Sequence, residues 1–236
     1  MFRLFYTPGW FNGYDLLFEG IVLIIALLIA GYSWRVYRIN KENKYAYFSL
    51  AFILVSLSLV FKMFTHGVLY SFPVRETVAN VLAPATGAHL RYADLFYRAG
   101  FFVQMASMLG AWLLIFLISQ KPRDRLKKYF ELSQIGLFVY LVLLISWVSN
   151  FEYMVFYLTS AVLLSLIVLN YYKNYLNTNN NKNAFSVLVA FIFMLFAYLC
   201  FVFVSLNSGL YVVGEALLLL GFLLLLCTYR KVVRKK

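Results

Sequence analysis

Seven long apolar runs alternate with shorter polar segments along the chain, and this pattern predicts an all-α membrane protein. Each run holds about twenty residues, which as an α-helix rising about 1.5 Å per residue crosses a hydrocarbon core of about 30 Å. The sequence therefore predicts a single seven-helix transmembrane domain over 1–236, with spans at 14–34, 47–70, 95–119, 129–149, 153–172, 184–206 and 210–229.

Composition supports this interpretation. Hydrophobic residues make up 64% of the chain and charged residues only 13%, which is too little polar surface to cover a water-soluble globule of 236 residues. The net charge of +12 does not indicate nucleic-acid binding, because the basic residues gather at the ends of the predicted helices and not along one polar face.

Cations concentrate in every second gap between the apolar runs, and this alternation predicts the orientation of the chain. The alternate gaps hold only Arg3, Arg75 and Arg91. Because short cytoplasmic loops are enriched in Lys and Arg, we expect an outer amino terminus, a cytoplasmic basic tail at 230–236 and residence in the cell membrane. The inner rim is expected to contact anionic lipid headgroups. Its basic residues are Arg35, Arg38, Lys41, Lys44, Lys121, Arg123, Arg125, Lys127, Lys128, Lys173, Lys182, Arg230, Lys231, Arg234, Lys235 and Lys236.

A weak internal similarity suggests that the chain is a duplication. Five residues between the first and second predicted helices recur at the same spacing between the fifth and sixth, which would make a 3+1+3 arrangement of two parallel repeats. A chance match in apolar sequence of low complexity is the alternative. The first set is Tyr37, Asn43, Lys44, Ala46 and Leu57, and the second is Tyr175, Asn181, Lys182, Ala184 and Leu195.

Four charged residues fall inside the predicted spans, at similar depth in the outer half of the membrane. They are Glu19, Lys62, Arg98 and Glu215. A charge at the centre of a membrane helix costs about 2.5 to 3.5 kcal/mol on insertion scales, so these four are the leading candidates for a site. We expect a ligand-binding vestibule in which Glu19 opposes Lys62 and Arg98 opposes Glu215. Two structural ion pairs that fix helix register are the alternative.

His66 extends this predicted site. It follows Ser58 and Lys62 at helical spacing, so all three share one face of the second helix. Imidazole titrates near physiological pH, which would let His66 take part in proton transfer. A hydrogen bond to a neighbouring helix is the simpler role for such a residue.

The only long outer connection, 71–94, is a candidate lid over the vestibule. Its chemistry-bearing residues are Arg75, Glu76, His89 and Arg91. A mobile tether is the alternative. A haem held by both histidines would require this loop to fold back over the second helix, and no cofactor or metal ligand set of the usual spacing is present in the sequence.

The sequence favours a protein that binds a small polar or anionic solute at the outer site. In a transporter, the same site would serve translocation of that solute. Lys62 and Arg98 would hold an anionic group while Glu19 and Glu215 balance the charge. Two alternatives stay open: a sensor module that signals through a separate partner, and a structural subunit of a larger membrane complex or oligomer. No phosphate-binding loop, Ser-His-Asp spacing or HxxxH pair favours an enzyme.

Overall fold

The computed structural model describes residues 7–70, 92–120, 136–137, 139–145, 153–178 and 181–234, with side chains over the same ranges except at 68–70, 92–97 and 232–234. Six long helices fill these ranges, and short 3-10 turns flank them at Gly9–Phe11 and Phe203–Ser205. The helices are α1 (Tyr14–Asn40), α2 (Asn43–Tyr70), α4 (Tyr92–Ser119), α6 (Tyr153–Asn177), α7 (Lys182–Val202) and α8 (Gly209–Arg234).

All six helices are long and apolar enough to cross a bilayer, which indicates an integral membrane protein. The described residues contain no β-strand. Of the predicted fourth span, 129–149, only 136–137 and 139–145 are described, and these are helical. The count of seven spans therefore stays a prediction.

Several helices extend past the apolar runs from which they were predicted. α1 continues from the expected end at residue 34 to Asn40, because polar Arg and Tyr residues carry on the helix outside the hydrocarbon layer. It ends at Lys41, whose φ of 56° is left-handed and whose backbone N–H hydrogen bonds Tyr37 O at 2.7 Å. α8 likewise runs to Arg234, beyond the expected end at 229.

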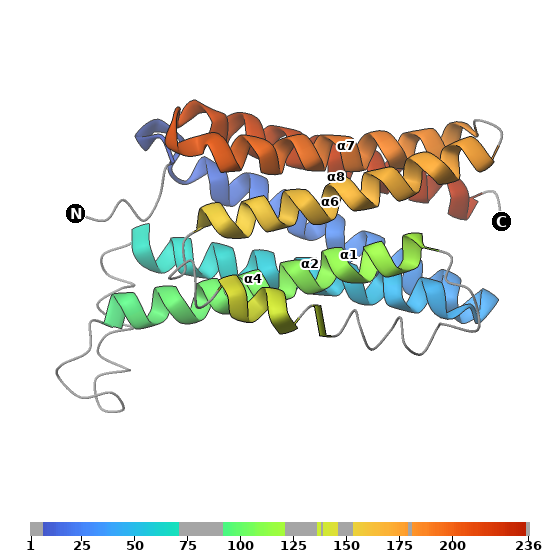
Figure 1. The fold of residues 1–236 in the computed structure, drawn as a ribbon, viewed down its shortest axis with the longest axis horizontal. Coiled ribbons are helices and arrows are strands. Elements are labelled where there is room, and N and C mark those ends of the chain that lie inside the picture. The colour runs from blue at the N-terminus through green and yellow to red at the C-terminus, as the bar shows by residue number, and fades with distance from the viewer. Residues whose placement is uncertain are drawn as a thin grey trace.

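The six helices form a closed ring. α1 packs on α2, α2 on α4, α4 on α6, α6 on α7, α7 on α8, and α8 returns to α1. Figure 1 shows that α1, α4, α6 and α8 run in one direction along the bundle while α2 and α7 run in the other. The start of α1 and the end of α8 therefore lie at opposite ends of the molecule.

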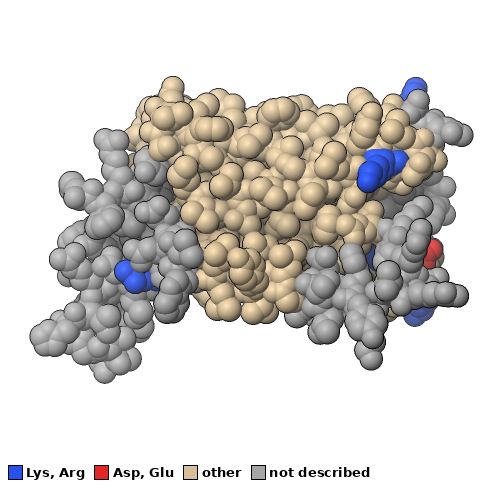
Figure 2. All heavy atoms as spheres, viewed as in Figure 1, with Lys and Arg blue, Asp and Glu red and all other residues tan. Residues whose placement is uncertain are grey.

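Large aromatic and aliphatic side chains fill the interior of the ring, and further apolar side chains cover its outside. Phe52, Trp112 and Phe191 are among the largest fully buried side chains. Ile24 is 60% exposed and Val162 is 55% exposed. Figure 2 shows the result on one face, where an uncharged belt separates charged side chains that gather toward the two ends. Such a belt is what acyl chains require.

Glycines let α8 approach α7 closely. A Cβ at Gly221 would lie 2.9 Å from the backbone oxygen of Ala190, and a Cβ at Gly214 would lie 2.5 Å from the ring of Phe201. Small residues at such crossings bring backbones together in membrane bundles. The approach at Gly214 places the Phe201 ring beside the neighbouring Glu215.

Candidate functional site

A buried lysine links three helices near the end of the bundle where α1 begins. Lys62 Nζ of α2 lies 2.7 Å from Glu19 Oε1 of α1 and 2.8 Å from Glu215 Oε1 of α8. The exposed fractions are 7% for Lys62, 1% for Glu19 and 0% for Glu215. The three side chains can meet because α1 packs against both α2 and α8 in the ring.

The triad is not electrically balanced by Lys62 alone. Two carboxyl groups share one ammonium, so with both carboxyl groups ionised the triad would carry a net charge of −1. A buried ion pair is tolerated because the partners compensate one another, and an excess charge in the same low-dielectric site is strongly disfavoured. One further positive charge, as a proton or a cation, brings the triad to neutrality.

His66 lies next to the triad, one turn along α2 from Lys62. Its Nδ1 is 3.6 Å from Asp15 Oδ2 and 3.7 Å from Glu19 Oε1. The other oxygen of Asp15, Oδ1, accepts hydrogen bonds of 2.9 Å from the backbone N–H groups of Gly13 and Leu16, which fixes the carboxylate at the start of α1. The imidazole nitrogen therefore lies close to oxygens of two carboxyl groups.

Aromatic rings close the cluster on the side of α7 and α8. Lys62 Nζ lies 5.6 Å from the centroid of the Tyr211 ring and 5.8 Å from that of Phe201. Phe201 in turn contacts Tyr157 of α6, with ring centroids 5.1 Å apart. Ring faces within about 6 Å attract a cation, so these contacts add to the stabilisation of the ammonium. They also keep bulk water away from it.

Three buried oxygen atoms beside the cluster have no hydrogen-bond partner within the described ranges. They are Glu19 Oε2, Glu215 Oε2 and the hydroxyl oxygen of Tyr211, while a fourth such oxygen, Glu19 Oε1, is in ion-pair contact with Lys62. Buried polar groups are nearly always satisfied, so such atoms mark places where a proton, a water molecule or a ligand is held. The site thus has spare hydrogen-bonding capacity.

The structure brings together four of the five residues predicted to bind a ligand, namely Glu19, Lys62, His66 and Glu215. The contact between Glu19 and Lys62 agrees with the sequence-based expectation. The other expected pair does not form, because Glu215 hydrogen bonds Lys62 and the side chain of Arg98 is exposed on α4. The long lysine stem reaches both carboxyl groups from one position.

Two residues outside the predicted set join the cluster. The candidate lid residues Arg75, Glu76, His89 and Arg91 fall outside the described ranges. Asp15 and Tyr211 were not assigned to the site from sequence. A signal for both exists, since each precedes a cluster glutamate by four residues and so shares its helix face.

No group of three or more His, Cys, Asp or Glu side chains suited to a metal ion occurs among the residues that the structure describes. In the cluster itself, the ammonium of Lys62 occupies the position between Glu19 and Glu215. Compared with protein families, with curated proteins and with solved structures, the chain has no significant match.

Proposed function

We propose that this integral membrane protein binds and translocates a small polar solute, and that the cluster of α1, α2 and α8 carries an exchangeable proton in that cycle. The observation that supports this most directly is the sharing of Lys62 by two fully buried carboxylates, Glu19 and Glu215, beside the imidazole of His66. Ionisable groups within a membrane bundle commonly serve as proton relays or ion pathways.

The geometry favours a proton or a cationic group over an anion at this position. The ammonium of Lys62 already contacts two carboxylates, so an anionic solute would have to displace one of them. A proton on His66 or on one carboxyl group adds the charge that the triad lacks. Movement of that proton would change the attraction that holds α1, α2 and α8 together, which couples protonation to helix packing.

The helix arrangement is compatible with a transporter built from two parallel repeats. α1, α2 and α4 follow one another around the ring with the same order and directions as α6, α7 and α8. A 3+1+3 chain would have this pattern, and repeats of this kind place substrate sites at their interface. In that arrangement Lys62 would lie at the interface of the repeats, because it joins α2 of the first set to Glu215 of α8 in the second.

Infrared spectroscopy of the purified protein tests the proton directly. Acidification is expected to change carboxyl or imidazole bands in the wild type, and Glu19→Gln, Glu215→Gln and His66→Gln are each expected to alter that change. Glu42→Gln is the matched control, because Glu42 pairs with Lys44 on the exposed connection between α1 and α2. Spectra that are the same in all cluster variants and the wild type would count against a labile proton.

Solute movement is tested in vesicles that contain the protein and an internal pH-sensitive dye. Pools of sugars, amino acids and amines are added outside, and the pool that is transported is expected to change the internal pH. In Glu215→Gln, solute uptake should no longer be accompanied by a change of internal pH. In Glu42→Gln, both uptake and the pH change should be preserved. Transport by the wild type without any pH change would rule out proton coupling.

A structural role is the second candidate, and the compact pairing of Lys62 supports it. Ammonium, carboxylates and aromatic rings together fix the relative positions of α1, α2 and α8. In that case replacing the cluster with apolar side chains would preserve the fold and every activity of the protein. The sensor module and the subunit of a larger complex remain further proposals, which co-purification with a stoichiometric partner would support.

A further inference from the structure

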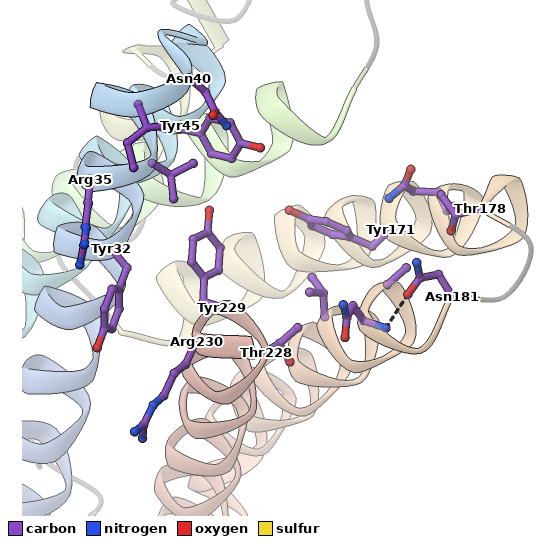
Figure 3. Close-up of a pocket in the computed structure, with 16 residues that line it drawn as sticks. Tyr32, Arg35, Asn40, Tyr45, Tyr171, Thr178, Asn181, Thr228, Tyr229 and Arg230 are labelled. Atoms are coloured by element: carbon purple, nitrogen blue, oxygen red, sulfur yellow. Dashed lines mark hydrogen bonds between the residues drawn. The ribbon is translucent and has the colours of Figure 1, made fainter. Parts of the chain in front are cut away.

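A second polar feature lies at the opposite end of the bundle from the charged cluster. It is a cavity of about 760 Å³ between the end of α1, the start of α2, the end of α6, the start of α7 and the end of α8 (Figure 3). Arg35, on its wall, follows Glu19 by sixteen residues, which corresponds to about 24 Å along an α-helix. The cavity and the cluster are therefore separate sites.

Two arginines make the cavity electropositive. Arg35 of α1 and Arg230 of α8 both line it, and Figure 3 shows them along one side with Tyr32 between them. None of the 16 lining residues is acidic. Neither arginine forms an ion pair with a carboxylate within the described part of the chain, in contrast to Lys62. Two positive charges thus border one cavity, and no lining residue compensates them.

Neutral hydrogen-bonding groups cover most of the remaining wall. Asn174 comes from α6, Thr178 directly follows that helix, and Asn183 comes from the first turn of α7. Asn181 caps that turn by accepting a hydrogen bond of 2.9 Å from the backbone N–H of Asn183. The positive end of the α7 dipole therefore adds to the field of the arginines. Val36 of α1 contributes apolar surface.

A packed aromatic layer borders the cavity toward the interior of the bundle. Tyr229 accepts a hydrogen bond of 2.9 Å from Ser33 Oγ, and its ring stacks on Phe48 with centroids 5.2 Å apart. Phe52 and Phe222, about one turn deeper on α2 and two turns deeper on α8, have centroids 6.1 Å apart. These packed rings close the side of the cavity that faces the interior of the bundle.

We propose that this cavity binds a phosphate-bearing anion. Guanidinium groups present parallel N–H donors that match the oxygens of a phosphate ester, and the amides and hydroxyls supply further donors. Arg35 directly follows Trp34 at the end of the apolar run, which is the level of lipid headgroups. The phosphate is supplied either by a membrane lipid or by a soluble phosphate ester. This proposal does not depend on the proposed transport function.

Two pairs of substitutions with equal charge change test the site. Arg35→Gln with Arg230→Gln removes both guanidinium groups of the cavity. Arg38→Gln with Lys231→Gln removes one exposed cation from each of the same helices, and neither of these residues lines the cavity. All four side chains are exposed, so both variants are expected to fold like the wild type. Thermal unfolding without ligand checks this.

The full-length protein is placed in phosphatidylcholine nanodiscs, with or without phosphatidylglycerol, or with glycerol 3-phosphate or inorganic phosphate in solution. Thermal unfolding and native mass spectrometry report binding. We expect about a tenfold loss of affinity for each cavity guanidinium removed, and little loss in the control pair. If phosphatidylglycerol is retained by the wild type and the control variant but lost when both cavity arginines are replaced, the ligand is a lipid. If glycerol 3-phosphate or inorganic phosphate stabilises the wild type and the control variant but not the variant without the cavity arginines, the ligand is a soluble phosphate.

Two outcomes would overturn the proposal. Equal losses in the cavity pair and the control pair would mean that the anion is attracted by the basic rim as a whole. No stabilisation of the wild type by any of the three probes, together with no phosphatidylcholine retained in native mass spectra, would mean that the cavity has no phosphate site.

Discussion

Replacement of Lys62 by methionine is the most informative single perturbation of the bundle. Methionine keeps most of the length and the apolar stem of lysine but removes the ammonium. Glu19 and Glu215 would then face each other at 1% and 0% exposure without the cation that both contact at 2.7 and 2.8 Å. The expected result is a large loss of stability, because two buried carboxylates lose their shared partner.

The size of this loss follows from the burial of the triad. Removing one partner of a buried ion pair typically costs about 3 to 5 kcal/mol, which is a large part of the about 5 to 15 kcal/mol that stabilises a folded domain. At about 2 to 4 °C per kcal/mol for a chain of this size, the midpoint of thermal unfolding should fall by roughly 10 °C. The loss of ring contacts with Tyr211 and Phe201 adds to it in the same direction.

The measurement is thermal unfolding in nanodiscs, with two comparison variants. Lys44→Met removes the lysine of an exposed ion pair with Glu42, where the side chains are 56% and 51% exposed, so it should cost less than about 1 kcal/mol. A triple variant that adds Glu19→Gln and Glu215→Gln to Lys62→Met should regain much of the loss, because it removes the uncompensated charges. If Lys62→Met is no worse than Lys44→Met, or the triple variant shows no recovery, the energetic argument for the triad is wrong.

Two further substitutions test the packing around the sites. Gly221→Ala places a Cβ 2.9 Å from the backbone oxygen of Ala190 and should destabilise the protein by about 1 to 3 kcal/mol, whereas Gly31→Ala, with nothing within 4 Å, should be neutral or slightly stabilising in the same unfolding assay. Equal effects would contradict the close approach of α7 and α8. Tyr229→Phe removes the hydrogen bond from Ser33 and should cost about 1 kcal/mol, and a Ser33→Ala variant should show no additional loss when combined with it.

The apolar runs predicted six of the helices that the structure describes, since a stretch of about twenty apolar residues leaves few alternatives to a spanning helix. They predicted helix ends less well. α1 and α8 continue for one turn or more beyond the apolar runs, because helix propensity and not hydropathy governs the polar ends.

The sequence predicted how deep in the membrane the site residues lie, but not the direction in which each side chain points. Glu19, Lys62 and Glu215 could be found from their unusual positions inside apolar runs, whereas the angle at which each side chain leaves its helix depends on how the helices pack. Arg98 has a similar depth but an exposed side chain on α4, and a single sequence does not distinguish these two situations. The arginine-lined cavity was missed for a related reason, since its walls come from five helices far apart along the chain.

The closed ring also bears on the order in which the chain enters the bilayer. α1 and α2 are joined by only two residues and pack against each other, so Glu19 and Lys62 can meet as a neutral hairpin as soon as both have been synthesised. Such pairing lowers the insertion barrier for both side chains. Glu215 joins only when α8, the last helix of the ring, docks on α1. During synthesis Glu215 would thus be the last of the three to arrive, after Glu19 and Lys62 have already paired.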